Sequence, residues 1–200
     1  MKFAYSVLER SAIYRAWQAP FANGKLAPLF LHNDLNRIHR VLDVGCGPGT
    51  NTHLFTHADY LGIDVNPDYI AFARERFGRQ FIVADAVNYQ VPREQSFDFI
   101  LVNSFFHHVD TGSVCRILHH LRTLLSPGGH IHILDLVLPD RASIARLLAR
   151  LDRGGYPRSL EKWRNLFSEH FELAIFEPYA VKLMQATLWN MVYCKGAAKQ

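Results

Sequence analysis

The chain has few cysteines, no long apolar run and no repeating pattern of glycine or proline. Its three cysteines, Cys46, Cys115 and Cys194, are widely spaced and form no Cys-x-x-Cys pair, which argues against a disulfide framework or a zinc site. No apolar run approaches the roughly 18 residues that a membrane span needs. The N-terminus lacks the apolar core of a secretion signal. We therefore expect a reducing, cytoplasmic setting.

The eleven histidines are scattered singly or as doublets, and none shows the His-Glu-x-x-His spacing that places two metal ligands on one helix face. No metal site is therefore expected. Apolar residues make up 49 % of the 200 residues and charged residues 20 %, a balance typical of a folded globular protein. At this length one sizeable core can form without disulfides or metals.

Apolar runs typical of strands alternate with helix-period stretches through the middle of the chain. The strand-like runs are 41–44, 60–64, 81–83, 97–102 and 131–138. The helices expected between them are 49–58, 67–77 and 114–125. Buried strands separated by helices predict a parallel sheet that is covered on both faces. Before this region, residues 1–35 suggest two helices with a break at Asn23-Gly24. After it, we expect two helices near 144–151 and 163–167. Strands over 171–176 and 187–194 should then form an antiparallel hairpin.

The strongest chemical signal is a glycine-rich loop directly after the first strand-like run. The segment Asp43-Val44-Gly45-Cys46-Gly47-Pro48-Gly49 has three glycines at alternate positions, so its backbone can turn tightly and approach a ligand closely. In an open parallel sheet, ligands bind beyond the carboxyl ends of the strands. The next two strands also end in acids, Asp64 and Asp85. Because Asp64 lies 19 residues after Gly45, it suits an acid that binds both hydroxyls of a ribose.

The carboxylate beside the loop decides between possible ligands. A dinucleotide fingerprint would place its third glycine at position 50, where this chain has Thr50. The charge of Asp43 would repel a pyrophosphate, but it would attract a ligand that joins ribose and adenine to an ammonium and a sulfonium group. S-adenosylmethionine is such a ligand, and we expect it as the cofactor.

These features resemble the class I S-adenosylmethionine-dependent methyltransferases. The resemblance runs from residue 40 to about 138 and rests on VLDVGCGPGT (41–50), LGIDVNPDYI (61–70), VADA (83–86), FDFILVNSFFHHV (97–109) and LLSPGGHIHILDL (124–136). It implies an α/β fold with a Rossmann-like, seven-stranded, mostly parallel sheet, helices on both faces, a C-terminal antiparallel hairpin and an N-terminal helical cap. We therefore expect one methyltransferase domain over 1–200, made of a cap (1–36), a cofactor-binding core (37–138), acceptor-site helices (139–170) and the hairpin (171–200).

By this resemblance, the glycine loop and the end of the fourth strand hold the methionine part of the cofactor. The matching positions are Asp43, Gly45, Cys46, Gly47 and Gly49 in the loop, with Asn103 and Ser104 after the strand. The nucleoside part falls to the next two strands. There Asp64 would bind the ribose, Val65 would contact the adenine face, and Asp85 with the backbone of Ala86 would bind the adenine amino group. In the cap, Tyr14 and Arg15 could touch the cofactor or the acceptor, or could be ordinary helix residues.

The candidates for a catalytic base are His107, His108 and Asp135. A base assists the transfer when the attacked oxygen or nitrogen carries a proton. The histidine doublet follows the fourth strand, so one ring could face the transferred methyl group. The simpler interpretation is that a neutral histidine packs against or caps the next helix. Asp135 could equally cap the end of the fifth strand.

Basic residues gather in one segment, 141–164, whose net charge is +5 in a chain of net charge +4. The resemblance places the acceptor site in this region. Because Arg binds phosphate or carboxylate with two hydrogen bonds at once, we expect a small, anionic acceptor held by Arg153, Tyr156 and Arg158. A solvated basic face is the alternative. The basic residues form no run with interleaved aromatics, so a nucleic-acid partner is not favoured.

Three other functions stay open at this point. A nucleotide-dependent oxidoreductase would share the sheet and the glycine loop, although Asp43 and Thr50 speak against it. A protein could also bind the cofactor without transferring its methyl group. A methyltransferase acting on RNA or protein is disfavoured because Asn103-Ser104-Phe105-Phe106 stands where an Asn-Pro-Pro-Tyr-type motif would be.

Overall fold

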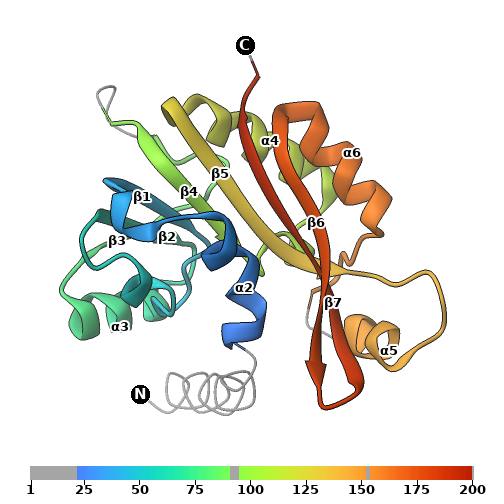
Figure 1. Cartoon of the computed structure of the whole chain (residues 1–200). Coiled ribbons are helices and arrows are strands. Elements are labelled where there is room, and N and C mark those ends of the chain that lie inside the picture. Colours follow the sequence, from blue (N-terminus) through green and yellow to red (C-terminus); the bar gives the residue numbers. More distant parts are fainter. Residues whose placement is uncertain (1–21, 91–94, 152–153, 200) are drawn as a thin grey trace.

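The computed structural model describes residues 22–90, 95–151 and 154–199 (Figure 1). Its centre is a seven-stranded sheet with the strand order β3-β2-β1-β4-β5-β7-β6. The strands are β1 (Arg40–Val44), β2 (Asp59–Asp64), β3 (Gln80–Val83), β4 (Phe97–Asn103), β5 (Leu125–Val137), β6 (Phe171–Leu183) and β7 (Ala186–Ala198). The helices are α2 (Ala22–His32), α3 (Pro67–Phe77), α4 (Thr111–Thr123), α5 (Ile144–Leu151) and α6 (Leu160–His170), with short 3-10 turns η2 (Leu35–Arg37), η3 (Thr52–Leu54) and η4 (Phe106–His108).

The first five strands are parallel and the last two are not. β1 pairs in parallel with β2 and β4, β2 with β3, and β4 with β5. β7 then runs antiparallel between β5 and β6. The predicted α/β fold with a parallel sheet and a C-terminal antiparallel hairpin is therefore confirmed.

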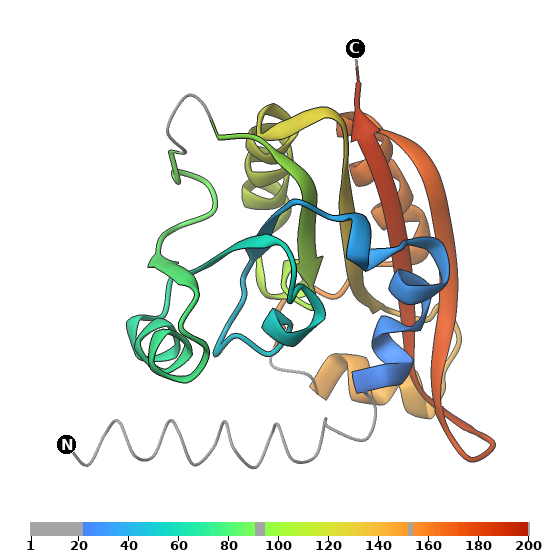
Figure 2. The same ribbon diagram turned by 60° about the vertical axis from the view of Figure 1, so that its left-hand side comes forward.

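Helices cover both faces of the sheet. One core layer joins α4 and α6 to the sheet through Ile117, Leu118, Trp163 and Phe167. The opposite layer joins α2 and α3 to it, and α5 packs beside β7 at the end of the hairpin. In Figure 2 the blue helix α2 lies in front of the red strands and the orange helix α6 lies behind them. Among the described residues no helix is long and apolar enough to cross a membrane.

The helices begin and end where their sequences provide caps. Asn66 precedes α3 and accepts hydrogen bonds from two backbone amides, while Pro67 takes the first helical position and Gly78, with a φ of 59°, ends the helix in the left-handed conformation. Asp110 caps α4 and Ser159 caps α6 through side-chain oxygens. These local signals explain why the boundaries of α3 were predictable, whereas α4 begins three residues before the predicted segment 114–125 and ends two residues before its end.

The helix expected over residues 49–58 is wrong. The segment holds only the short turn η3, because its backbone leaves the helical region on both sides of that turn: Gly49 has a φ of 80°, and Phe55 has a φ of −121° and a ψ of 53°. The guanidinium of Arg79 donates to the carbonyl oxygens of Phe55, Thr56 and Ala58 at 2.7–3.0 Å. Arg79 thereby supplies donors to three carbonyl oxygens that follow η3.

Other boundaries differ in extent. Asn23 and Gly24 lie in the first turn of α2 and not at a break; residues 1–21, including the rest of the predicted cap, lie outside the described residues. The hairpin strands are longer than the apolar pattern indicated. β6 is the edge strand of the sheet, a position where a strand tolerates a proline such as Pro178.

Candidate functional site

The carboxyl ends of the parallel strands meet at one edge of the sheet, and most of the predicted cofactor-binding residues lie there. The loop 45–49 follows β1, Asp64 ends β2, Asp85 follows β3, and Asn103 ends β4. This edge is where an open parallel sheet binds its ligands. The expected grouping of these residues at one edge follows directly from the strand order.

The glycine loop has the backbone that only glycine adopts without strain. Gly45, Gly47 and Gly49 have φ angles of 68°, 53° and 80°, all in the left-handed region. A side chain at Gly45 would lie 2.7 Å from the ring of Phe105, whereas one at Gly47 would meet no atom within 4 Å. The backbone amides of Gly45 and Cys46 both donate to the carbonyl of Ile63 on β2. The loop is thus tied to the neighbouring strand and open above Gly47.

Asp43 lies beneath this loop with no exposed surface. Its carboxylate accepts a hydrogen bond from the Tyr60 hydroxyl at 2.6 Å and from the Asn51 amide at 3.2 Å. Burial raises the pKa of Asp43 to about 6, although both hydrogen bonds act in the opposite direction. At neutral pH the loop therefore covers a negative charge that water does not reach.

Asn51 links Asp43 to the end of β4. Its amide nitrogen donates to Asp43, while its oxygen accepts from the Asn103 amide at 3.2 Å. Asn103 in turn accepts from the hydroxyl of Ser104, a residue whose φ of 54° is uncommon for a residue other than glycine. Asn51, Tyr60 and Phe105 belong to the site but were missed, because strand and loop patterns do not indicate which polar groups pair across elements.

Asp64 presents a carboxylate at the end of β2. It accepts hydrogen bonds from the backbone amides of Gly47 at 3.0 Å and Asn66 at 2.8 Å. An ionised carboxylate offers about four acceptor positions, so half of them remain. The adjoining Val65 is 64 % exposed, an unusual position for a large apolar side chain. A polar edge and an apolar surface therefore lie side by side here.

Asp85 and Cys46 have more ordinary surroundings. Asp85 is exposed and accepts from the backbone amide of Val87 and the side chain of Asn88, as a cap of the turn after β3 does. Ala86 beside it is buried. Cys46 is buried too, and desolvation together with nearby Asp43 raises the pKa of its thiol. The Cys46 thiol is therefore protonated and is no nucleophile.

A hollow of about 510 Å³ lies on the α3 side of the loop. It is lined by Pro48, Thr50, His53, Phe72, Arg76 and Phe77. None of the predicted cofactor ligands lines it, so we do not assign the cofactor to this space.

The three candidates for a base come together. His107 Nδ1 lies 2.7 Å from Asp135 Oδ1, and both side chains are buried. The other oxygen of Asp135 accepts from the backbone amide of Phe106 at 2.8 Å, which holds the carboxylate in place. The rings of His107 and His108 lie 4.2 Å apart, with His108 exposed. Asp135 is thus a partner of His107, which the sequence alone left undecided.

Arg158 differs from its expected position. We expected it to bind the acceptor, but the residue is only 4 % exposed. Its guanidinium donates to the carbonyls of Phe106 at 2.9 Å and Val109 at 2.6 Å, and it lies over the ring of Trp163 at 4.8 Å. The structure therefore assigns Arg158 to holding η4 and the start of α4, because its hydrogen-bond donors are directed into the protein.

Of the remaining residues predicted to bind the cofactor or the acceptor, only Tyr156 lies within the described part of the chain. Tyr156 is 49 % exposed, and its backbone amide donates to the carbonyl of His107 at 3.0 Å. Tyr14, Arg15 and Arg153 lie outside the described residues. Their roles stay predictions.

Known proteins resemble this chain over the region that contains the ligand edge. The family described as a methyltransferase domain matches residues 41–129. Trans-aconitate 2-methyltransferase of Escherichia fergusonii is 37 % identical over 111 residues, covering 53 % of this chain and 41 % of that protein. The protein of the same name from Methylobacterium nodulans is 29 % identical over 172 residues, covering 80 % and 62 %. The chain thus spans less than two thirds of the length of either relative.

A solved structure shares the fold. The N-methyltransferase NodS from Bradyrhizobium japonicum, in complex with S-adenosyl-L-homocysteine, superimposes with a TM-score of 0.66 at 16 % identity, covering 93 % of this chain and 87 % of that one. At this identity the likeness is one of fold. It agrees with the sheet topology described above.

Proposed function

We propose that the chain is a class I S-adenosylmethionine-dependent methyltransferase, and that it transfers a methyl group from this cofactor to an O, N or C atom of a small, anionic acceptor. One observation carries the proposal: an open glycine loop covers a buried carboxylate, Asp43, and adjoins a second carboxylate, Asp64, at the next strand end. The two charges suit a cationic nucleoside and disfavour a pyrophosphate.

The residues present fit S-adenosylmethionine. The open space above Gly47 lets a ligand approach the backbone, and the remaining acceptor positions of Asp64 suit the ribose hydroxyls. The exposed Val65 would offer an apolar surface to the adenine ring, and Asp85, which follows β3, would accept a hydrogen bond from the adenine amino group. Hydrogen bonds through Asn51 and Asn103 link Asp43 to the end of β4, where its negative charge would favour the methionine ammonium.

When bound, S-adenosylmethionine supplies a methyl group that its sulfonium charge has already activated. The protein then has to align the attacking atom, exclude water and take up a proton where the acceptor carries one. Phe105 packs against Gly45 and lies two residues before His107 in the sequence. We assign the proton to His107, because Asp135 fixes the orientation of its ring and stabilises the imidazolium.

The acceptor is proposed to be anionic for two reasons. The relatives from Escherichia fergusonii and Methylobacterium nodulans are named for trans-aconitate, a carboxylate. In this chain the segment after β5 carries five net positive charges, and α5 exposes Arg150 on its surface. Arg153 and the exposed Tyr156 remain candidates for binding the acceptor, whereas the buried Arg158 does not.

Calorimetric titration with S-adenosylhomocysteine and with NAD tests the cofactor. We expect binding of S-adenosylhomocysteine that Asp64→Asn weakens at least tenfold, and none of NAD. Preferred binding of NAD would contradict the proposal and favour an oxidoreductase.

Turnover is tested with a panel of di- and tricarboxylates, each compared with its neutral ester, while S-adenosylhomocysteine release is measured. We expect His107→Gln to lower kcat by about 10²–10⁴-fold with unchanged cofactor affinity. The exposed His108→Gln is the matched control. Cofactor binding without turnover on any acceptor would instead indicate a protein that binds the cofactor and transfers nothing, and turnover of the esters alone would exclude an anionic acceptor.

A further inference from the structure

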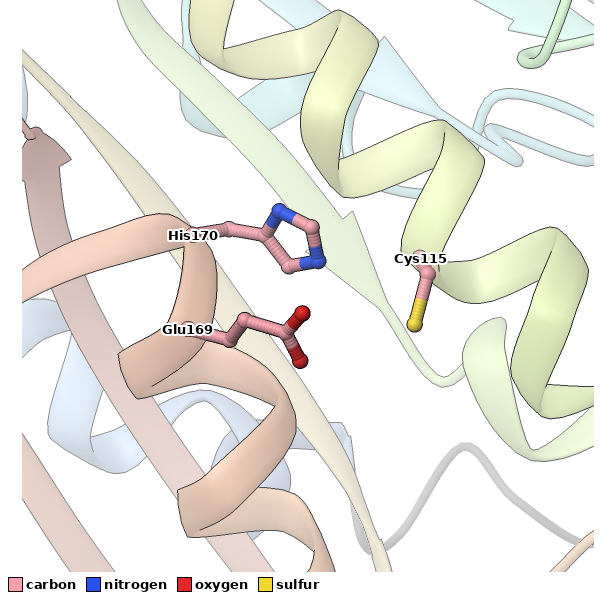
Figure 3. Close-up of side chains that lie close together, drawn as sticks. All are labelled: Cys115, Glu169 and His170. Carbon is pink, nitrogen blue, oxygen red and sulfur yellow. The ribbon is translucent and has the colours of Figure 1, made fainter.

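Away from the ligand edge, three side chains with metal-binding atoms converge between α4 and α6. Cys115 comes from the second turn of α4, while Glu169 and His170 come from the last turn of α6. Figure 3 shows the imidazole and the carboxylate directed from α6 toward α4, where the side chain of Cys115 lies in the same gap. One ligand atom from each residue lies within 4.8 Å of the other two.

The His170 ring has a polar atom that the protein leaves unused. His170 is 9 % exposed, and its Nε2 has no hydrogen-bond partner among the described residues. A buried polar atom without a partner costs about 1–3 kcal/mol, so such atoms usually have a water or an ion beside them.

The set of donor atoms suits one kind of metal ion. A thiolate, an imidazole and a carboxylate together match Zn²⁺, which binds S, N and O at about 2.0–2.3 Å in a tetrahedron. That geometry separates neighbouring ligand atoms by about 3.3–3.8 Å, so rotations of side chains close the present spacing. The thiolate and the carboxylate together balance the charge of a divalent ion.

Solvent reaches the same place. Cys115 and His170 line a hollow of about 550 Å³, together with His119 one helical turn beyond Cys115. This space leaves the fourth tetrahedral position open to a water molecule. We propose that Cys115, Glu169 and His170 bind one Zn²⁺ ion, which links α4 to α6.

The proposal is independent of methyl transfer and is tested by metal binding. The 200-residue chain, freed of metals with EDTA, is titrated with Zn²⁺ against a chromophoric chelator and, separately, with Co²⁺. We expect one Zn²⁺ per chain and a thiolate-to-Co²⁺ charge-transfer band. Cys115→Ser should abolish the band, and His170→Gln should weaken Zn²⁺ binding by about 100-fold or more, since loss of outer partners alone costs 10–100-fold.

The controls separate this site from others on the chain. Glu172→Gln removes an exposed carboxylate nearby on β6 and should leave Zn²⁺ affinity unchanged. Cys46 and Cys194 are buried, so they should give no cobalt band. Because His170 is buried, Glu169→Gln at an exposed position provides a second variant if His170→Gln does not fold. Absence of stoichiometric binding, a cobalt band that survives Cys115→Ser, or an affinity that Glu169→Gln leaves unchanged would overturn the proposal.

Discussion

Replacing Asp43 by Asn removes a buried charge that the folded protein tolerates poorly. The pKa of Asp43 is raised from 3.8 to about 6, chiefly because burial penalises the carboxylate. Between these two values the folded protein keeps a proton that the unfolded chain has released. The contribution of Asp43 to stability is therefore fully present below pH 3.8 and is lost as the pH rises through 6.

The magnitude follows from the shift. A difference of about two units corresponds to about 3 kcal/mol of unfolding free energy, with most of the change between pH 4 and pH 6.5. Asp43→Asn cannot ionise, so it should gain this amount relative to the unmodified protein on going from acid to pH 8. An Asn side chain still accepts the hydrogen bond from Tyr60, but its amide group has to find its own acceptor beside Asn51. That mismatch lowers the unfolding free energy of the variant by the same amount at every pH, so the pH dependence of the difference is unchanged.

The assay is urea unfolding of both proteins at a series of pH values, without cofactor. Asp59→Asn, at an exposed position of β2, is the matched control for the loss of one carboxylate. Under the proposed function the same Asp43→Asn variant should bind S-adenosylhomocysteine at least tenfold more weakly. A difference in stability between Asp43→Asn and the unmodified protein that does not change from pH 4 to pH 8 would refute the reasoning.

Three further substitutions test the site and its frame. Gly45→Ala should lower the free energy of unfolding by about 2 kcal/mol or more and abolish cofactor binding, because its φ is 68° and Phe105 lies 2.7 Å from the new carbon. Gly78→Ala, at a φ of 59° with no neighbouring atom, should lower it by about 1 kcal/mol. Equal losses of stability in thermal unfolding would argue against a clash at Gly45. Arg158→Gln should destabilise by about 3 kcal/mol, since it removes charged hydrogen bonds to buried carbonyls, while the exposed Arg150→Gln should not; a changed acceptor KM at unchanged stability would restore Arg158 to the acceptor site. Gly154→Ala places a carbon against the His107 ring and should lower kcat at unchanged cofactor affinity, whereas Gly155→Ala meets no atom within 4 Å and should not. Equal activity of the two variants would contradict the assignment of His107.

The sequence by itself determined the strands of the sheet, the helices α3 to α6 and the position of the ligand edge. These follow from local rules: apolar runs make buried strands, Asn66 and Gly78 delimit α3, and the glycines at 45, 47 and 49 permit left-handed backbone. Parallel strands bring their carboxyl ends to one edge, so Asp64 and its neighbours could be grouped before any coordinates.

Only the tertiary structure decided which polar groups pair and which are buried. It joined His107 to Asp135, which lies 28 residues away, directed Arg158 inward to carbonyls about 50 residues away, and paired Arg79 with the carbonyl of Ala58. It also brought Cys115 of α4 to His170 of α6, a pair with no recognisable spacing along the chain. Such pairings depend on how helices and strands pack across the sheet, and a periodic pattern describes only one element at a time.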